Sequence, residues 1–151
     1  MGEDEGDADQ DDEADFELDE TSAAGRGRAL NTPLVKEMNR IIKALIYIKT
    51  WPKNAKPKGG NPFAVPLIRG ETTSVPDSYF DKIANPLDLS TIKKRIDQDY
   101  YVTFEQFAKD VTLVASNAIE YNTQGTGQLM AIHLSECVRK ELDKGQKALG
   151  L

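Results

Sequence analysis

Apolar residues recur along most of the chain with the three-to-four-residue spacing of an amphipathic helix. This spacing predicts four helices, over about 33–50, 89–97, 104–122 and 126–145. The strict alternation of apolar and polar residues that is typical of a strand does not extend over a useful length. The pattern therefore predicts an all-α protein built as a four-helix bundle.

Side chains suited to helix N-caps support these boundaries. Each can accept a hydrogen bond from a free amide in the first turn, and the four candidates are Thr32, Asp88, Thr103 and Thr126. Gln106 lies three residues after Thr103, which is the spacing of a capping box. The first helix is expected to end at Trp51-Pro52, because a residue before proline disfavours the helical conformation.

A long segment between the first two predicted helices, about 51–87, lacks this periodicity. It holds six of the seven prolines and the pair Gly59-Gly60. Loops of this length are uncommon in compact domains and are usually functional. The segment also contains several large apolar residues, so we expect an ordered loop lying on the core, with a short helix near 77–83.

Charge divides the chain into two parts. Twelve of the 25 acidic residues lie within residues 1–20, which hold no base, so the remaining chain carries 19 bases against 13 acids. A self-repelling acidic segment with few apolar residues is expected to be disordered. The predicted organisation is a disordered acidic tail and linker over 1–31 and a folded domain over 32–151. The tail is interpreted as solvating, with mimicry of a polyanion or attraction of basic partners as alternatives.

The sequence offers little support for catalysis or metal binding. His133 and Cys137 are the only histidine and cysteine, so neither a disulfide nor the usual zinc ligand set is expected. Gly125-Thr-Gly127 lacks the third glycine and the preceding strand of a dinucleotide-binding loop. No apolar run is long enough for a transmembrane helix. We therefore expect that the protein is not an enzyme, binds no cofactor and does not associate with a membrane.

Basic residues leave room for a weak auxiliary contact with DNA. The densest run is Lys93-Lys94-Arg95, and the loop Lys53–Lys58 adds three lysines. This falls short of the basic surface expected of a dedicated DNA-binding protein.

Two stretches resemble the bromodomain family when they are taken together. They are VPDSYFDKIANPLDLSTI from Val75 to Ile92 and FEQFAKDVTLVASNAIEYN from Phe104 to Asn122. Their order and spacing match the family's Pro-Asp-Tyr-Tyr, Pro-Met-Asp-Leu and terminal Tyr-Asn motifs, and the resemblance covers about 33–147. It implies a left-handed four-helix bundle in which the long first loop and the last inter-helix loop frame an acetyl-lysine pocket.

The resemblance also implies roles for residues at the matching positions. Asn122 would donate its side-chain amide to the acetyl carbonyl, and Tyr79 would hold the same oxygen through a water. Phe63, after Pro62, matches the phenylalanine of the family's Trp-Pro-Phe shelf. The other implied pocket residues are Val65, Leu67, Tyr121 and Asn117, the last with a structural role as an alternative.

The gatekeeper at the start of the last helix is assigned to Leu129. The length of the preceding loop leaves the register open, so Gly127 and Gln128 are alternatives.

Two positions depart from the family pattern. Asn61 stands where the shelf tryptophan is expected, and Ser78 is an extra residue before Tyr79. Trp51-Pro52 is interpreted as unrelated to the shelf, because it lies about ten residues too early. A smaller residue at 61 predicts a wider pocket mouth, so that Asn61→Trp would tighten binding.

These inferences lead to one functional hypothesis and two alternatives. The resemblance implies a monomeric, nuclear, non-catalytic module that binds acetylated histone peptides or other acetylated proteins. The first alternative is a protein-interaction scaffold with a degenerate pocket, and the second is an auxiliary nucleic-acid contact module.

Overall fold

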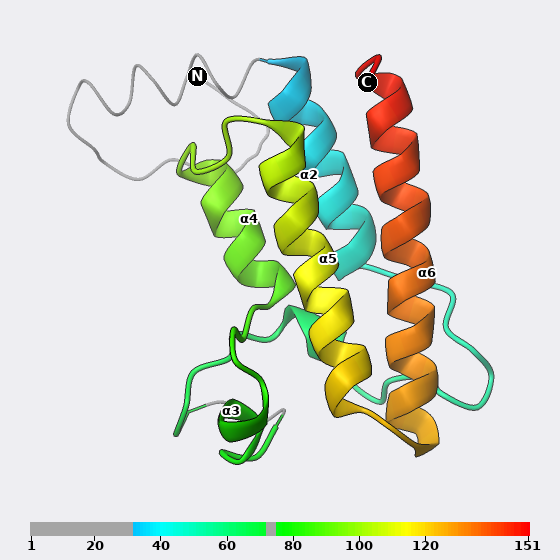
Figure 1. Ribbon diagram of the computed structural model, residues 1–151. Coiled ribbons are helices and arrows are strands. Elements are labelled where there is room, and N and C mark those ends of the chain that lie inside the picture. Colours follow the sequence, from blue (N-terminus) through cyan, green and yellow to red (C-terminus); the bar gives the residue numbers. More distant parts are fainter. Residues whose placement is uncertain (1–31, 72–74) are drawn as a thin grey trace.

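The computed structural model describes residues 32–71 and 75–151, and these residues form a helical bundle (Figure 1). The expected acidic tail and linker lie outside the described residues. The long helices are α2 (Pro33–Ile46), α4 (Leu89–Asp97), α5 (Phe104–Tyr121) and α6 (Gly125–Ala148). The described part contains no strand, so the predicted all-α class is confirmed.

The loop between α2 and α4 carries two short helical turns, η1 (Pro62–Ala64) and α3 (Tyr79–Lys82). The segment after α2 runs past the lower half of α6 and then returns to the lower end of the bundle (Figure 1). Tyr79, Ile83 and Leu87 are buried, so the described parts of the loop do lie on the core. No helix among residues 32–71 and 75–151 is long and apolar enough to cross a membrane.

Local capping sets the starts of α4 and α5 as predicted. The Asp88 carboxylate accepts a hydrogen bond from the Thr91 amide at 2.7 Å. Thr103 and Gln106 form the complete capping box, because each side chain accepts a hydrogen bond from the other residue's backbone amide. These two predictions succeed because donor and acceptor are only three residues apart.

The first helix ends earlier than the sequence suggests, at Ile46 rather than near residue 50. Tyr47 has already left the helical conformation, with φ −107° and ψ 41°. The Asn61 amide donates to the carbonyls of Leu45 and Ile46, at 2.8 and 3.4 Å. A side chain from the returning loop therefore hydrogen-bonds the last carbonyls of α2. Trp51-Pro52 lies beyond the end of this helix and does not terminate it.

The last helix also differs from the prediction at both ends. It begins at Gly125 without a side-chain cap, so Thr126 lies inside the first turn and is not the N-cap. It continues past Gly145, which is buried in the helix interface. A Cβ at residue 145 would lie 2.5 Å from Ile41 and 3.3 Å from Phe104. Gly145 thus allows α6 to approach α2 closely rather than ending the helix.

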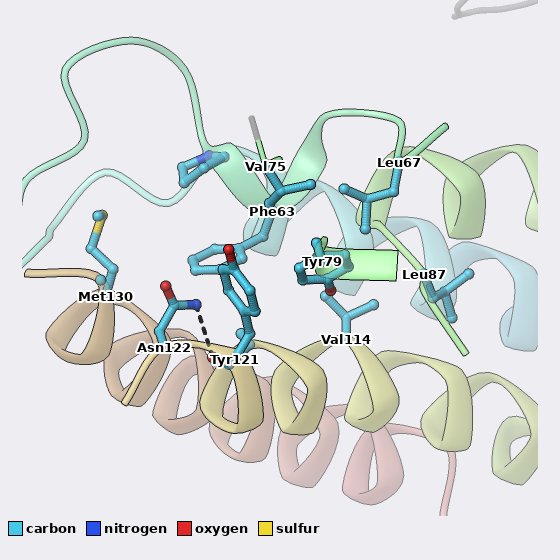
Figure 2. Close-up of a pocket in the computed structure, with 12 residues that line it drawn as sticks. Phe63, Leu67, Val75, Tyr79, Leu87, Val114, Tyr121, Asn122 and Met130 are labelled. Carbon is cyan, nitrogen blue, oxygen red and sulfur yellow. Dashed lines mark hydrogen bonds between the residues drawn. The ribbon is translucent and has the colours of Figure 1, made fainter. Parts of the chain in front are cut away.

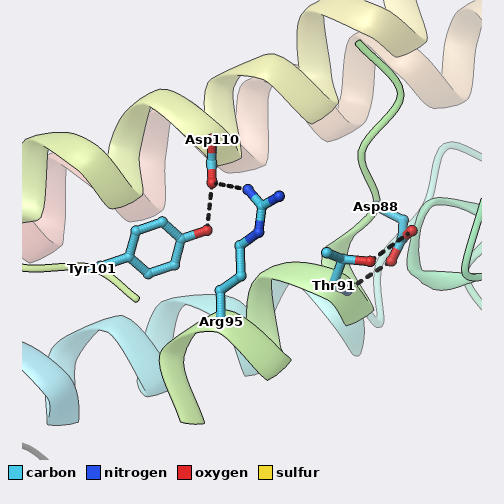
Figure 3. A network of polar contacts seen from close by, with 5 residues as sticks. All are labelled: Asp88, Thr91, Arg95, Tyr101 and Asp110. Atoms are coloured by element: carbon cyan, nitrogen blue, oxygen red, sulfur yellow. Dashed lines mark hydrogen bonds and ion pairs between the residues drawn. The ribbon is translucent and has the colours of Figure 1, made fainter. Parts of the chain in front are cut away.

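A half-buried polar network holds α4 against α5 (Figure 3). The Asp110 carboxylate accepts hydrogen bonds from the Arg95 guanidinium and the Tyr101 hydroxyl, both at 2.6 Å. Burial and then the hydrogen bond to Asp110 raise the pKa of the Tyr101 hydroxyl well above its usual range. Tyr101 therefore remains a neutral donor in the folded protein.

Candidate functional site

A pocket of about 190 Å3 opens at the lower end of the bundle, where the long loop meets the end of α5 and the start of α6 (Figure 2). Most of its wall is apolar or aromatic, with one amide at its edge. The lining residues are Pro62, Phe63, Leu67, Val75, Tyr79, Leu87, Val114, Ala118, Tyr121, Asn122, Gly127 and Met130.

Asn122 directly follows the last residue of α5. Its backbone amide and its side-chain Nδ2 both donate to the carbonyl of Ala118, at 2.9 and 2.8 Å. These two bonds fix the orientation of the side chain. A primary amide carries two N–H donors, so the second N–H of Asn122 remains for a ligand in the pocket.

Aromatic rings form the middle of the pocket. Tyr79 and Tyr121 meet edge to face with centroids 4.8 Å apart, and Phe63 lies beside them (Figure 2). Burial, followed by the charge of Glu120, raises the pKa of the Tyr79 hydroxyl. Among the described residues no hydrogen bond engages this hydroxyl, so a neutral phenol donor is available beside the pocket.

The cap of α4 also positions the pocket wall. Asp88 Oδ2 accepts a hydrogen bond from the backbone amide of Leu67 at 3.0 Å, while Oδ1 caps the helix at Thr91. Figure 3 shows the Asp88–Thr91 contact. One buried carboxylate thus joins the loop to the helix, and this places Leu67 against the pocket.

Asn61 does not line the pocket. Its side chain points to the end of α2, as described above, and its Oδ1 accepts a hydrogen bond from the Phe63 amide at 2.9 Å. The residue therefore fixes η1 and the start of the shelf through polar bonds. The size of residue 61 therefore does not set the width of the pocket mouth, which was the reason for expecting Asn61→Trp to tighten binding.

Trp51 lies close to the shelf despite its distance along the sequence. Its ring centroid is 6.5 Å from that of Phe63 and 5.4 Å from that of His133 on α6. The indole N–H donates to the Ile48 carbonyl at 3.2 Å. The loop therefore brings the tryptophan beside Phe63, contrary to its interpretation as unrelated to the shelf.

The structure brings together six of the nine residues that the resemblance assigns to the site. These are Pro62, Phe63, Leu67, Tyr79, Tyr121 and Asn122. The other three lie elsewhere. Val65 is half-buried in the loop outside the pocket wall, Leu129 is 42% exposed on α6, and Asn117 is buried with its amide donating to the Asn85 carbonyl at 2.8 Å.

The start of α6 explains why Leu129 does not line the pocket, whereas Gly127, one of its two alternatives, does; Gln128, the other alternative, is absent from the wall. Because the helix begins at Gly125, Gly127 and Met130 face the pocket while Leu129 turns outward. The sequence did not indicate Met130 as a lining residue, nor Val75, Leu87 and two residues of α5. Val114 and Ala118 precede Asn122 by eight and four residues, so helical spacing alone places them on its face.

Comparison with known proteins identifies the family. The family model described as Bromodomain matches residues 47–134, more than half of the chain. The chain is 35% identical over 88 residues to the human ATPase family AAA domain-containing protein 2B, which covers 58% of the chain and 6% of that protein. It is 43% identical over 65 residues to Histone acetyltransferase GCN5 of Yarrowia lipolytica, covering 43% and 13%. It is 45% identical over 48 residues to the SWR1 complex bromodomain subunit bdf1 of Schizosaccharomyces pombe, covering 32% and 8%.

The chain belongs to the bromodomain family, whose members are non-catalytic modules that bind acetylated lysine. It spans only a small part, 6–13%, of these three relatives. The similarity therefore concerns this module and not the activities of the whole proteins.

Proposed function

We propose that this domain binds acetylated lysine in histone tails, with Asn122 as the anchor of the acetyl carbonyl. The observation that carries the proposal is the fixed Asn122 amide at the edge of an apolar pocket. An amide N–H is a neutral donor that matches an amide oxygen. Two relatives are a histone acetyltransferase and a bromodomain subunit of the SWR1 complex, which supports a histone partner and a nuclear location.

The pocket distinguishes a neutral acetylated side chain from a charged one. Among the described lining residues none carries an acidic side chain, so an unmodified lysine ammonium would lose water without gaining a charged partner there. Burial of about five carbons at ~0.8 kcal/mol each favours the acetylated form. One hydrogen bond adds about 1 kcal/mol. After ordering costs, a single site is expected to bind with a Kd on the order of tens of micromolar to millimolar.

An array of histone peptides, each in acetylated and unmodified form, tests this function. We expect the domain to bind acetylated members only. Equal binding to both forms would exclude the acetyl-lysine function and would favour the scaffold alternative.

Of the two basic segments that the sequence suggests for a weak auxiliary DNA contact, the ion pairs favour the loop over the helix. In the run at 93–95, Lys93 pairs with Asp97 at 2.8 Å and Arg95 with Asp110 at 2.6 Å. The exposed loop residues Lys53, Lys56 and Lys58 have no ion pair within the described residues. The loop is therefore the better candidate, and a DNA affinity that is independent of salt concentration would exclude it.

A further inference from the structure

Positive charge is concentrated in one part of the folded chain. Residues 38–70 include seven basic residues and no acidic residue, whereas residues 75–151 include nine basic and eleven acidic residues. The net positive charge of the described residues therefore comes from the second half of α2 and the loop that follows this helix. A concentrated basic surface of this kind attracts anionic partners.

Four lysines of this loop are available to a partner. Each is exposed, and none forms an ion pair within the described residues. These loop lysines are Lys49, Lys53, Lys56 and Lys58. The two arginines of the same basic stretch are already paired, Arg40 with Glu141 at 2.8 Å and Arg69 with Asp81 at 2.6 Å. The loop therefore presents four positive charges that no described acidic side chain neutralises by direct contact.

The sequence contains a segment of the opposite character. Residues 1–20, here called the acidic segment, include twelve acidic residues and no basic residue. Phe16 and Leu18 are its only large apolar residues besides Met1, so charge is its main means of binding. Opposite charges steer two surfaces together and select the partner. The acidic segment and the loop lysines are complementary in this sense.

The acidic segment can reach the loop lysines of its own chain. Eleven residues, 21–31, separate Glu20 from Thr32 at the start of α2, and an extended chain of this length spans up to about 40 Å. Helix α2 has 14 residues and is therefore about 21 Å long. The loop starts at the far end of α2 (Figure 1), well within this reach.

We propose that the acidic segment binds the loop lysines of the same chain and shields them from other polyanions. The contact is electrostatic, so it weakens as the screening length falls from about 10 Å at 0.1 M salt to about 3 Å at 1 M. DNA must displace the acidic segment before it reaches the loop, which makes the auxiliary DNA contact conditional. This inference does not depend on the acetyl-lysine anchor.

A synthetic peptide of residues 1–20 tests the contact by calorimetric titration. The recipient is the full chain with the twelve acids of its own acidic segment replaced by asparagine or glutamine, which removes the internal competitor. We call this protein the neutral-segment variant. We expect saturable binding of the peptide at about 0.1 M salt and an affinity at least about tenfold lower at about 1 M.

Two sets of substitutions in the neutral-segment variant locate the contact. The first set is Lys49→Gln, Lys53→Gln, Lys56→Gln and Lys58→Gln. The control set removes the same charge from exposed lysines of α4, α5 and α6 that also form no ion pair within the described residues, and it consists of Lys94→Gln, Lys109→Gln, Lys140→Gln and Lys144→Gln. We expect the first set to weaken peptide binding by about tenfold, because four exposed ion pairs of modest strength are lost. The control set should weaken it by no more than about twofold.

Trp51 reports on the contact within the intact chain. It is the only tryptophan of the sequence and lies between Lys49 and Lys53. An increase from about 0.1 M to about 1 M salt releases the acidic segment. We therefore expect the Trp51 emission of the wild-type chain to change with salt and that of the neutral-segment variant to stay constant. The change should not depend on protein concentration, because the contact lies within one chain.

Several results would overturn the inference. Equal losses from the two lysine sets would show a diffuse attraction without a site on the loop. The same response of Trp51 in both proteins would show that the acidic segment does not occupy the loop. A response that grows with protein concentration would assign the contact to a second copy of the chain. Binding of a DNA duplex but not of the peptide would show that the loop takes nucleic acid instead.

Discussion

The side chain of Asn122 lies directly against Gly127. A Cβ at residue 127 would be 2.6 Å from Asn122 Oδ1, much closer than ordinary van der Waals contact. The amide is fixed on its other side by the Ala118 carbonyl. The absence of a side chain at residue 127 therefore allows Asn122 to keep the orientation that leaves one N–H for the pocket.

Gly127→Ala is expected to weaken acetyl-lysine binding more than it weakens the fold. The new methyl group displaces the end of the Asn122 side chain, and the loss of one hydrogen bond to the ligand corresponds to about a two- to tenfold lower affinity. Thr126→Ala, at an exposed position one residue earlier, is the control and should bind normally. Calorimetry that gives equal affinities for the two variants would show that Asn122 does not need the space at Gly127.

Asn61→Ala is expected to destabilise the domain. It removes the donor to the Leu45 and Ile46 carbonyls and the acceptor of the Phe63 amide, at a cost of about 1–3 kcal/mol in the free energy of unfolding. Asn54→Ala, at an exposed position in the same loop, is expected to have little effect. Urea denaturation measures the stability of both variants. Equal unfolding midpoints would show that the hydrogen bonds of the Asn61 side chain do not stabilise the domain.

The same contacts reverse the expectation for Asn61→Trp. Tryptophan cannot accept the hydrogen bond from the Phe63 amide, and residue 61 does not face the cavity. Asn61→Trp should therefore weaken binding or leave it unchanged. A tighter complex with an acetylated peptide would support the placement at the pocket mouth that the sequence suggested.

Trp51→Ala is expected to reduce binding although Trp51 does not line the pocket. Its ring lies against that of Phe63, with centroids 6.5 Å apart, and the loss of a half-buried aromatic contact costs about 1–3 kcal/mol in stability. Trp51→Phe should restore most of the acetyl-peptide affinity because it keeps a ring against Phe63. If the wild-type domain, Trp51→Ala and Trp51→Phe bind the acetylated peptide equally well, Trp51 has no role in positioning Phe63.

Stability is expected to fall at alkaline pH because of Tyr101. Its pKa in the folded state lies above the value of about 10 in the unfolded chain, so the unfolded state loses this proton first. The stabilisation is complete below about pH 10 and decreases as the pH rises further, by at most about 1.4 kcal/mol per pH unit. Tyr101→Phe should make this dependence shallower in urea denaturation series, and an unchanged slope would contradict the assignment.

Helix boundaries set by neighbouring residues could be predicted from the sequence, and those set by distant residues could not. Asp88 and Thr103 cap the helices that immediately follow them. The end of α2 depends instead on Asn61, at least fifteen residues away along the chain. Such a contact has no periodic pattern, so the first helix was predicted about four residues too long.

The same distinction holds for the site. Tyr121 and Asn122 could be placed because they terminate a strongly periodic helix and match a motif. The residue at the start of α6 could not, since one turn of uncertainty separates Gly127 from Met130. The relation between Trp51 and Phe63 depends on the path of an irregular loop, which is fixed by tertiary contacts and not by local propensity.

A calorimetric comparison of the wild-type domain with the Asn122→Ala variant tests the central claim most directly. Both proteins are titrated with one histone peptide in acetylated and unmodified form, with Thr123→Ala, exposed on the adjacent residue, as the control. We expect the domain and Thr123→Ala to bind only the acetylated peptide. Asn122→Ala should lose about 1–3 kcal/mol, enough to abolish detectable binding at this weak affinity. A folded Asn122→Ala variant that binds the acetylated peptide with unchanged affinity would contradict the assignment of the anchor.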